Sequence, residues 1–240
     1  MSKKCLIRQP AGLGDILFCQ KIAKRVIKDF DLDVIWPVIP EFKDVIPYIT
    51  SDRITYVDAS EDFEGSHLYH TPINNVVESE DFIYVPLQHA DQLRLDESVM
   101  VSKYKQVNLD YEDWPDYLTI TRNFDKEDKL YKDVLGLDDQ EDYVLVNKNY
   151  GSPPDSRKCD RINVISEKRI VNMDYYDGFN LFDWCKVVEG ASEIHTVDTA
   201  LVCIAEKLKL CDNLNIYSRW NPSNFQHVKP MLYVDWEYHY

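Results

Sequence analysis

The residues with the clearest chemical potential form a glycine-paired turn near the start of the chain. Residues 9–15 read Gln-Pro-Ala-Gly-Leu-Gly-Asp and connect an apolar run with an amphipathic pattern that begins at Ile16. Such a turn places flexible backbone and one carboxylate where the carboxyl end of a strand meets a helix N-terminus, an edge at which α/β proteins bind phosphorylated ligands. The pattern therefore predicts a site, with Gly12, Gly14 and Asp15 as its candidate residues.

Asp15 has a structural and a chemical interpretation. As an N-cap, its side chain would accept a backbone N–H and complement the helix dipole, and the two glycines would serve only the turn. As a general base, it would take a proton from an acceptor hydroxyl while that oxygen attacks. The four residues alone favour the N-cap. A dinucleotide site is disfavoured further, because the third glycine is missing and the strand that ends at Trp36 has no acidic residue for a ribose.

A second turn of this type lies late in the chain. Residues 194–200 read Ile-His-Thr-Val-Asp-Thr-Ala and run directly into an apolar helical pattern. Asp198 is an ordinary N-cap in the structural interpretation. In the chemical one, the Thr199 hydroxyl and the first N–H groups of the helix hold a diphosphate, while Asp198 orders the turn or accepts from a ligand hydroxyl. Taken alone, this turn also favours the structural interpretation.

The elements around both turns alternate as in a parallel α/β layer. Strands are predicted at 4–8, 33–38, 54–57, 82–86, 143–146, 193–197 and 214–217, and helices at 16–30, 41–49, 127–135, 181–189 and 200–208. The acidic run 138–142 separates two such groups. We therefore expect an α/β fold of two Rossmann-like domains, residues 1–138 and a shorter 139–240.

Composition excludes several functional classes. The formal charge of −15 disfavours a broad nucleic-acid-binding face, which needs clustered lysine and arginine. The first residues are too short an apolar stretch for a signal peptide, and nowhere does an apolar run reach the length of a membrane span. The six cysteines form no C-x-x-C pair, which favours free thiols in a reducing compartment. We expect a cytoplasmic protein without a membrane span, and the sequence leaves its oligomeric state open.

Together, the two turns resemble the heptosyltransferase-like branch of the GT-B glycosyltransferases. That family carries a G-x-G-D turn near the N-terminus and a D-T-G-x-x-H-x-A-like turn in its donor domain. Residues 12–15 and 183–208 follow the same order and approximate spacing. The resemblance implies two Rossmann-like domains facing across a cleft, with the acceptor bound mainly by the first and the nucleotide-sugar donor mainly by the second.

The resemblance also implies roles for individual residues. Asp15 would be the catalytic base, and Gly12 and Gly14 would allow close approach of the acceptor. The donor-side residues would be Asp198 and Thr199, together with a basic residue after the first strand of the second domain; these candidates are Lys148, Arg157 and Lys158. The chain departs from the family pattern at Ala200, where glycine is usual, and at Cys203, near the usual histidine.

The leading functional hypothesis is therefore a glycosyltransferase that moves a sugar from a nucleotide-sugar to a hydroxyl acceptor such as a glycan. The resemblance implies one inverting displacement without a metal or other cofactor, and no D-x-D motif stands at a suitable strand end. The alternative is a catalytically inactive GT-B-like protein that binds sugars or nucleotides or serves in assembly, which Ala200 and the short second half favour. A nucleotide-dependent oxidoreductase is the least favoured of the three.

Overall fold

The computed structural model describes residues 3–96, 98–151, 156–210, 212–219 and 225–240. By their contacts, the residues divide into two compact units. Unit 1 holds residues 1–119 and 226–231, and unit 2 holds residues 120–225 and 232–240. Each unit contains its own five-stranded sheet. The predicted fold class, two Rossmann-like α/β domains, is confirmed.

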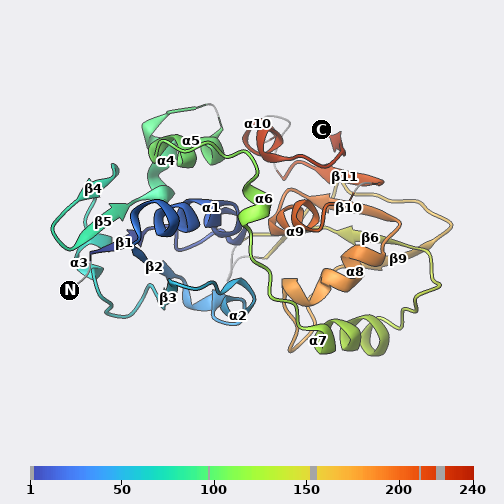
Figure 1. Cartoon of the computed structure of the whole chain (residues 1–240). Helices are drawn as coiled ribbons and strands as arrows, with labels where there is room; N and C mark the ends of the chain where they lie inside the picture. Colours follow the sequence, from blue (N-terminus) through green and yellow to red (C-terminus); the bar gives the residue numbers. More distant parts are fainter. Residues whose placement is uncertain (1–2, 97, 152–155, 211, 220–224) are drawn as a thin grey trace. The chain divides into compact units, whose positions relative to one another are not determined.

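The sheet of unit 1 is parallel except for one short edge strand (Figure 1). Its strands are β1 (Lys4–Ile7), β2 (Asp33–Val38), β3 (Ile54–Asp58), β4 (Val77–Glu78) and β5 (Phe82–Val85). Their order is β3-β2-β1-β5-β4. The chain therefore places β2 and β3 on one side of β1, and then β4 and β5 on the other side. The carboxyl ends of β1 and β5 therefore form the topological switch point of this sheet, where ligands of open α/β sheets bind.

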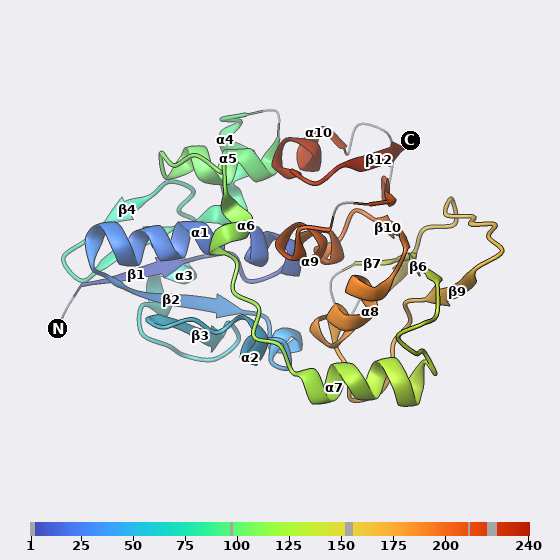
Figure 2. The ribbon, with the colours of Figure 1, turned by 45° about the vertical axis from the view of Figure 1, so that its right-hand side comes forward.

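Short helices and one long helix complete unit 1. The long helix, α1 (Leu13–Phe30), runs alongside β1 and β2 (Figure 2) and buries Ile16, Cys19, Ile22 and Ala23. The others are η1 (Pro40–Phe42), α2 (Ile46–Ile49), α3 (Ser66–Tyr69), η2 (Leu87–His89), α4 (Ala90–Leu93), α5 (Val99–Gln106), α6 (Trp114–Tyr117), α10 (Phe225–Val228) and η6 (Lys229–Met231).

The sheet of unit 2 is parallel throughout. Its strands, in the order β12-β11-β10-β6-β9, are β6 (Tyr143–Asn147), β9 (Arg169–Asn172), β10 (Glu193–Val197), β11 (Leu214–Tyr217) and β12 (Trp236–His239). Its switch point lies between β6 and β10. The sequence analysis missed β9 and β12, because both are four-residue edge strands in which two of the four residues are polar.

The described part of unit 2 holds short helices and one nine-residue helix. They are α7 (Phe124–Asp128), the π-helical η3 (Lys129–Val134), η4 (Leu181–Trp184), α8 (Cys185–Gly190) and α9 (Ala200–Leu208). Helices α8 and α9 lie side by side (Figures 1 and 2). The described part of the β6–β9 connection holds a hairpin, β7 (Asn149–Tyr150) with β8 (Arg157–Lys158), in place of a crossover helix. Cys159 and Ile162 from this connection cover Val144 and Val146 of β6.

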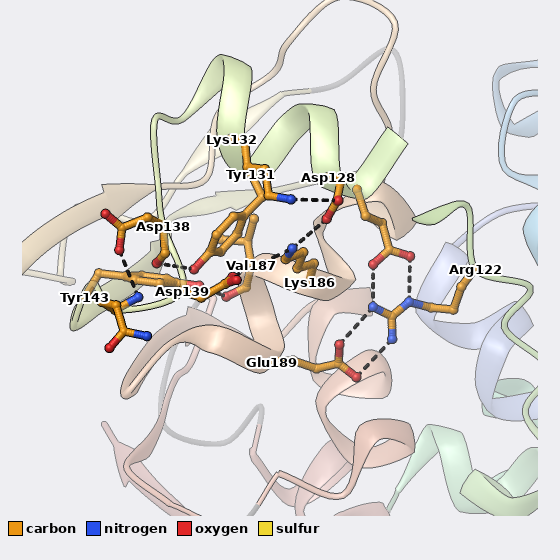
Figure 3. A network of polar contacts seen from close by, with 12 residues as sticks. Arg122, Asp128, Tyr131, Lys132, Asp138, Asp139, Tyr143, Lys186, Val187 and Glu189 are labelled. Atoms are coloured by element: carbon orange, nitrogen blue, oxygen red, sulfur yellow. Dashed lines mark hydrogen bonds and ion pairs between the residues drawn. The ribbon is translucent and has the colours of Figure 1, made fainter. Parts of the chain in front are cut away.

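The contact boundary lies between residues 119 and 120, whereas the sequence predicts it at 138. A charged network explains the difference. The Arg122 guanidinium donates to the buried Glu127 carboxylate, with Nε to Oε1 at 2.6 Å, and to Glu189 on α8 at 2.9 and 2.8 Å (Figure 3). These bonds tie residues 120–138 to unit 2. The roles predicted for the two halves, acceptor side and donor side, stay predictions.

The aromatic C-terminal segment is anchored within unit 2 by a buried carboxylate. Glu206 of α9 accepts hydrogen bonds from the Tyr233 N–H at 3.0 Å, the Val234 N–H at 3.3 Å and the Trp236 indole N–H at 2.9 Å. Burial raises the pKa of the Glu206 carboxyl, and the three donors only partly oppose this shift. The anchor positions β12 beside β11.

We expect Glu206→Gln to destabilise the protein least at high pH. Because the pKa of Glu206 is raised in the folded state, its contribution to stability is full below the unfolded pKa of about 4.3 and is lost as pH rises through the folded pKa. The amide of the variant does not titrate, so its contribution does not change with pH, but its single oxygen accepts from fewer of the three N–H donors. Urea unfolding from pH 4 to 8 should show the gap between wild type and variant narrowing as pH rises. The exposed Glu167→Gln is the matched control, and a gap that widens contradicts the assignment.

The cysteines of the described chain are free and buried, which confirms the expectation for five of the six: Cys5, Cys19, Cys159, Cys185 and Cys203. Cys211 lies outside the described residues. Burial raises the pKa of the Cys5, Cys19 and Cys185 thiols to about 12, so these side chains are inert packing groups. No helix in the described part is long and apolar enough to cross a bilayer.

Candidate functional site

The GLGD turn lies at the switch point of the sheet in unit 1. Residues 8–12 leave the carboxyl end of β1, and α1 begins at Leu13. Gly12 is the N-cap of α1 and has a φ of 77°, a left-handed conformation that favours glycine. A Cβ atom at Gly12 would lie 2.5 Å from Asp15 Oδ2, so any other residue would displace this carboxylate oxygen as well as strain the backbone.

Asp15 is therefore in the first turn of α1 and is not its N-cap. The N-cap interpretation is wrong, because the helix begins three residues earlier than the apolar pattern indicates. The Asp15 side chain is 34% exposed, and its Oδ1 pairs with the Lys103 ammonium at 3.0 Å. This carboxylate thus stands at the edge where a ligand of this sheet would bind, accessible to solvent and held by a cation.

Two cationic side chains, Arg8 and Lys103, lie near the carboxyl ends of β1 and β5. The Arg8 guanidinium donates to the Thr71 carbonyl and the Tyr84 hydroxyl, both at 3.3 Å, and lies 4.8 Å from the centre of the Tyr69 ring. Lys103 is buried and lies in α5, a helix that follows β5 along the chain. Burial, followed by the charge of Arg8, lowers the pKa of His89, which keeps this imidazole neutral at pH 7.

The predicted donor residues gather at the switch point of the sheet in unit 2. Asn147, the last residue of β6, donates from Nδ2 to Thr196 Oγ1 at 3.0 Å and to Thr199 Oγ1 at 3.3 Å. Lys148 follows directly and is half-buried. Asn147 therefore joins the strand end that carries Lys148 to the turn that carries Asp198 and Thr199, as the hypothesis requires.

Thr199, and not Asp198, is the N-cap of α9. Its side chain makes no capping hydrogen bond, so the Thr199 hydroxyl does not accept from the first N–H groups of the helix. A nine-residue helix with such an N-terminus is a favourable position for an anion. The N-cap interpretation of Asp198 is wrong, because its carboxylate is directed away from the helix N–H groups toward Arg219.

Asp198 is a buried carboxylate with one oxygen engaged. Its Oδ1 accepts from the Arg219 backbone N–H and Nε, both at 3.0 Å. Its Oδ2 is buried and has no hydrogen-bond partner among the residues that the structure describes. Burial raises the pKa of the Asp198 carboxyl, although Arg219 opposes the shift. Asp198 therefore connects the turn before α9 to Arg219 after β11.

The other predicted cations lie on the hairpin after β6. Arg157 is exposed on β8, opposite Tyr150, and Lys158 forms an ion pair with Asp174 at 3.2 Å. Of the three candidates, Lys148 is the one that directly follows Asn147, the residue that bonds Thr199.

Sequence reasoning missed four residues of these two edges: Gln9, Lys103, Asn147 and Arg219. Asn147 and Arg219 carry a readable signal, because each ends or follows a parallel strand on the edge already predicted to hold the donor. Lys103 carries none, since only the packing of α5 brings it to Asp15. Arg161 also reaches the donor edge, where its guanidinium donates to the Ser218 carbonyl.

The hollow on the opposite edge of the same sheet is structural. It measures ≈ 270 Å³ and is lined by Tyr131, Asp139, Glu141, Lys186, Glu189 and Gly190. These residues lie near the amino ends of β6 and β10. The Lys186 ammonium pairs with Asp128 at 2.5 Å and lies 4.7 Å from the centre of the Tyr131 ring (Figure 3). The network joins η3 to α8 and faces away from the switch point.

Comparison with known proteins agrees with this description of the fold. No family model and no curated protein matches the sequence. A solved structure of the glycosyl transferase family 9 from Veillonella parvula DSM 2008 is similar, with 10% identity and a TM-score of 0.58, over 99% of this chain and 86% of that one. This likeness confirms the predicted resemblance to a GT-B glycosyltransferase at the level of fold.

Two further solved structures are similar at 10% identity. One is the iron-containing dodecameric glycosyltransferase TibC from enterotoxigenic E. coli H10407, with a TM-score of 0.49 over 90% of this chain and 59% of that chain. The other is the E. coli heptosyltransferase WaaC with ADP, with a TM-score of 0.42 over 91% of this chain and 88% of that chain.

Proposed function

We propose that this chain is a glycosyltransferase that moves a sugar from a nucleotide-sugar donor to a hydroxyl acceptor. The observation that carries the proposal is the placement of the two turns. Each sheet has one of them at its switch point, a carboxylate held by Lys103 in unit 1 and the N-terminus of α9 with nearby cations in unit 2. These are the two kinds of group that sugar transfer needs, a base for the acceptor and an anion site for the leaving diphosphate.

The proposed reaction is a single displacement. Asp15 takes the proton of the acceptor hydroxyl as that oxygen forms a bond to the anomeric carbon. The bond between the anomeric carbon and the diphosphate oxygen breaks, and the nucleoside diphosphate leaves with the electron pair. Thr199, Lys148 and the first N–H groups of α9 stabilise the charge on the departing diphosphate. One displacement inverts the anomeric centre.

Asp198 has a separate part in this proposal. It orders the turn before α9, because its Oδ1 accepts from the Arg219 backbone N–H and Nε, both at 3.0 Å. Arg157, on the hairpin after β6, contributes a further positive charge on the donor side. Gly12 and Gly14 leave room for the acceptor beside Asp15. The cytoplasmic location and the identity of the acceptor stay predictions of the same kind.

We expect Thr199→Val to weaken nucleoside diphosphate binding about 10- to 150-fold, since one hydrogen bond to a charged group is worth roughly 1.5–3 kcal/mol. The fold tolerates the change, because Asn147 Nδ2 keeps its bond to Thr196. Calorimetric titration with ADP, UDP and GDP measures the effect. The exposed Thr55→Val, on β3 of unit 1, is the matched control. Equal affinity in both variants and wild type would contradict the donor assignment.

A catalytically inactive nucleotide- or sugar-binding protein is the second candidate. Ala200 supports it, because this residue adds a side chain at the first position of α9, where the resembling family has glycine. The assay that separates the two candidates is release of nucleoside diphosphate from ADP-, UDP- and GDP-sugars, with and without a panel of glycan acceptors. Acceptor-dependent release supports the transferase, and binding without release supports the inactive protein.

A further inference from the structure

Lys103 is an unusual lysine for a chain with this net charge. It lies in α5, and only 3% of its side chain is exposed. Its ammonium contacts three acceptors, with Asp15 Oδ1 at 3.0 Å, Gln9 Oε1 at 2.5 Å and the Leu87 carbonyl at 3.3 Å. Two of these contacts are hydrogen bonds, to Gln9 and Leu87, and the contact with Asp15 is an ion pair. The buried ammonium is thus compensated by one carboxylate and two neutral oxygens.

The three acceptors come from the segments that make the switch point of unit 1. Gln9 follows β1, Leu87 follows β5, and Asp15 lies in the first turn of α1. The Gln9 side chain is itself oriented, because its Nε2 donates to the Ala11 carbonyl at 2.6 Å and thereby turns Oε1 toward the ammonium. Buried lysine is rare unless it is paired, and here a single ammonium joins both strand ends to the proposed base.

Lys103 and Gly12 hold the Asp15 carboxylate from two sides. The ammonium contacts Oδ1, while Oδ2 lies against the face of Gly12 that has no Cβ. One oxygen is therefore engaged with protein, and the other lies over the glycine that the turn requires. The two oxygens of Asp15 are not equivalent in this arrangement.

We propose that Lys103 is the positioning residue for Asp15, fixing Oδ1 so that Oδ2 takes the proton of the acceptor hydroxyl. The inference rests on the proposed function and adds to it. In the transfer step a bond forms between Oδ2 and the proton, and the O–H bond of the acceptor breaks. Lys103 keeps its own protons and touches no substrate.

The test is a set of kcat and KM measurements on Lys103→Met, using the ADP-, UDP- or GDP-sugar that the wild type turns over. We expect kcat to fall about 100-fold, because a displaced base loses that much, and the donor KM to stay within twofold. Combined with Asp15→Asn, the Lys103 change should lower kcat by less than a further twofold. Lys105→Met, on an exposed side chain of the same helix, is the control and should keep wild-type kcat.

The outcomes are distinguishable. If the wild type turns over a donor and Lys103→Met has the same kcat, this inference alone is overturned. The same holds if the effects of Lys103→Met and Asp15→Asn on kcat are fully additive in the double variant. A wild type that turns over none of the donors overturns the proposed function, and this inference with it. Circular dichroism verifies folding. If Lys103→Met does not fold, Lys103→Arg replaces it, since a planar guanidinium cannot reproduce the three contacts; a tenfold loss of kcat supports positioning, and wild-type kcat overturns it.

Discussion

Replacing Asp15 by asparagine is expected to lower the rate of sugar transfer between 10² and 10⁴-fold, the usual contribution of a general base. The amide keeps the size of the side chain but cannot accept the proton of the acceptor. Affinity for ADP, UDP or GDP is expected to stay unchanged, because the donor residues belong to unit 2. Steady-state kinetics and calorimetric titration measure the two quantities on the same preparation.

A purely structural Asp15 makes a different prediction. A first-turn carboxylate complements the helix dipole, which is worth about 0.3–1 kcal/mol of stability and should not affect the chemical step. Asp91→Asn is the matched control, because Asp91 is an exposed first-turn acid of α4 in the same unit. Equal rates in wild type and Asp15→Asn would contradict the assignment of Asp15 as base.

Arg122→Met is expected to cost about 3–5 kcal/mol of unfolding free energy, because removing one partner of a buried ion pair leaves the other charge buried and unpaired. Glu127 is fully buried, and Arg122 is its cation. The cost arises at the Glu127 carboxylate, because this charge stays buried and unpaired after its partner is removed. Pairing with Glu127 and Glu189 also raises the pKa of the Arg122 guanidinium, which keeps it charged throughout the accessible pH range.

Urea unfolding measures this loss, with Arg25→Met as control. Arg25 forms an exposed ion pair with Asp29 four residues along α1, and such pairs are worth about 0–1 kcal/mol. The double variant Arg122→Met/Glu127→Leu should recover much of the loss, because it leaves no unpaired buried charge. A loss below about 1 kcal/mol in Arg122→Met would show that the network does not hold residues 120–138 in unit 2.

Much of the fold could be predicted, because periodicity reports local structure. The strands from β1 to β3 and the helix α9 follow from apolar spacing within a few residues. Positions that depend on partners far along the chain could not. The start of α1 depends on the φ of Gly12, and the boundary near residue 120 depends on Arg122 reaching α8.

The candidate site divides in the same way. Asp15, Lys148 and Thr199 could be named because each lies next to a strand end that the sequence shows. Lys103 could not be assigned a role, because its importance comes from an ion pair with a carboxylate far away in the sequence. The sequence indicates which residues lie at the carboxyl ends of the strands. It does not indicate which side chain from another element contacts them.

The central claim is that the two turns hold the base and the donor diphosphate of one transferase. The most direct test is a crystal structure of the chain with ADP, UDP or GDP, whichever binds in calorimetry. The account predicts the diphosphate at the N-terminus of α9, within hydrogen-bond distance of Thr199 and Lys148. A diphosphate bound at any other place, or no nucleotide bound at millimolar concentration, would contradict it.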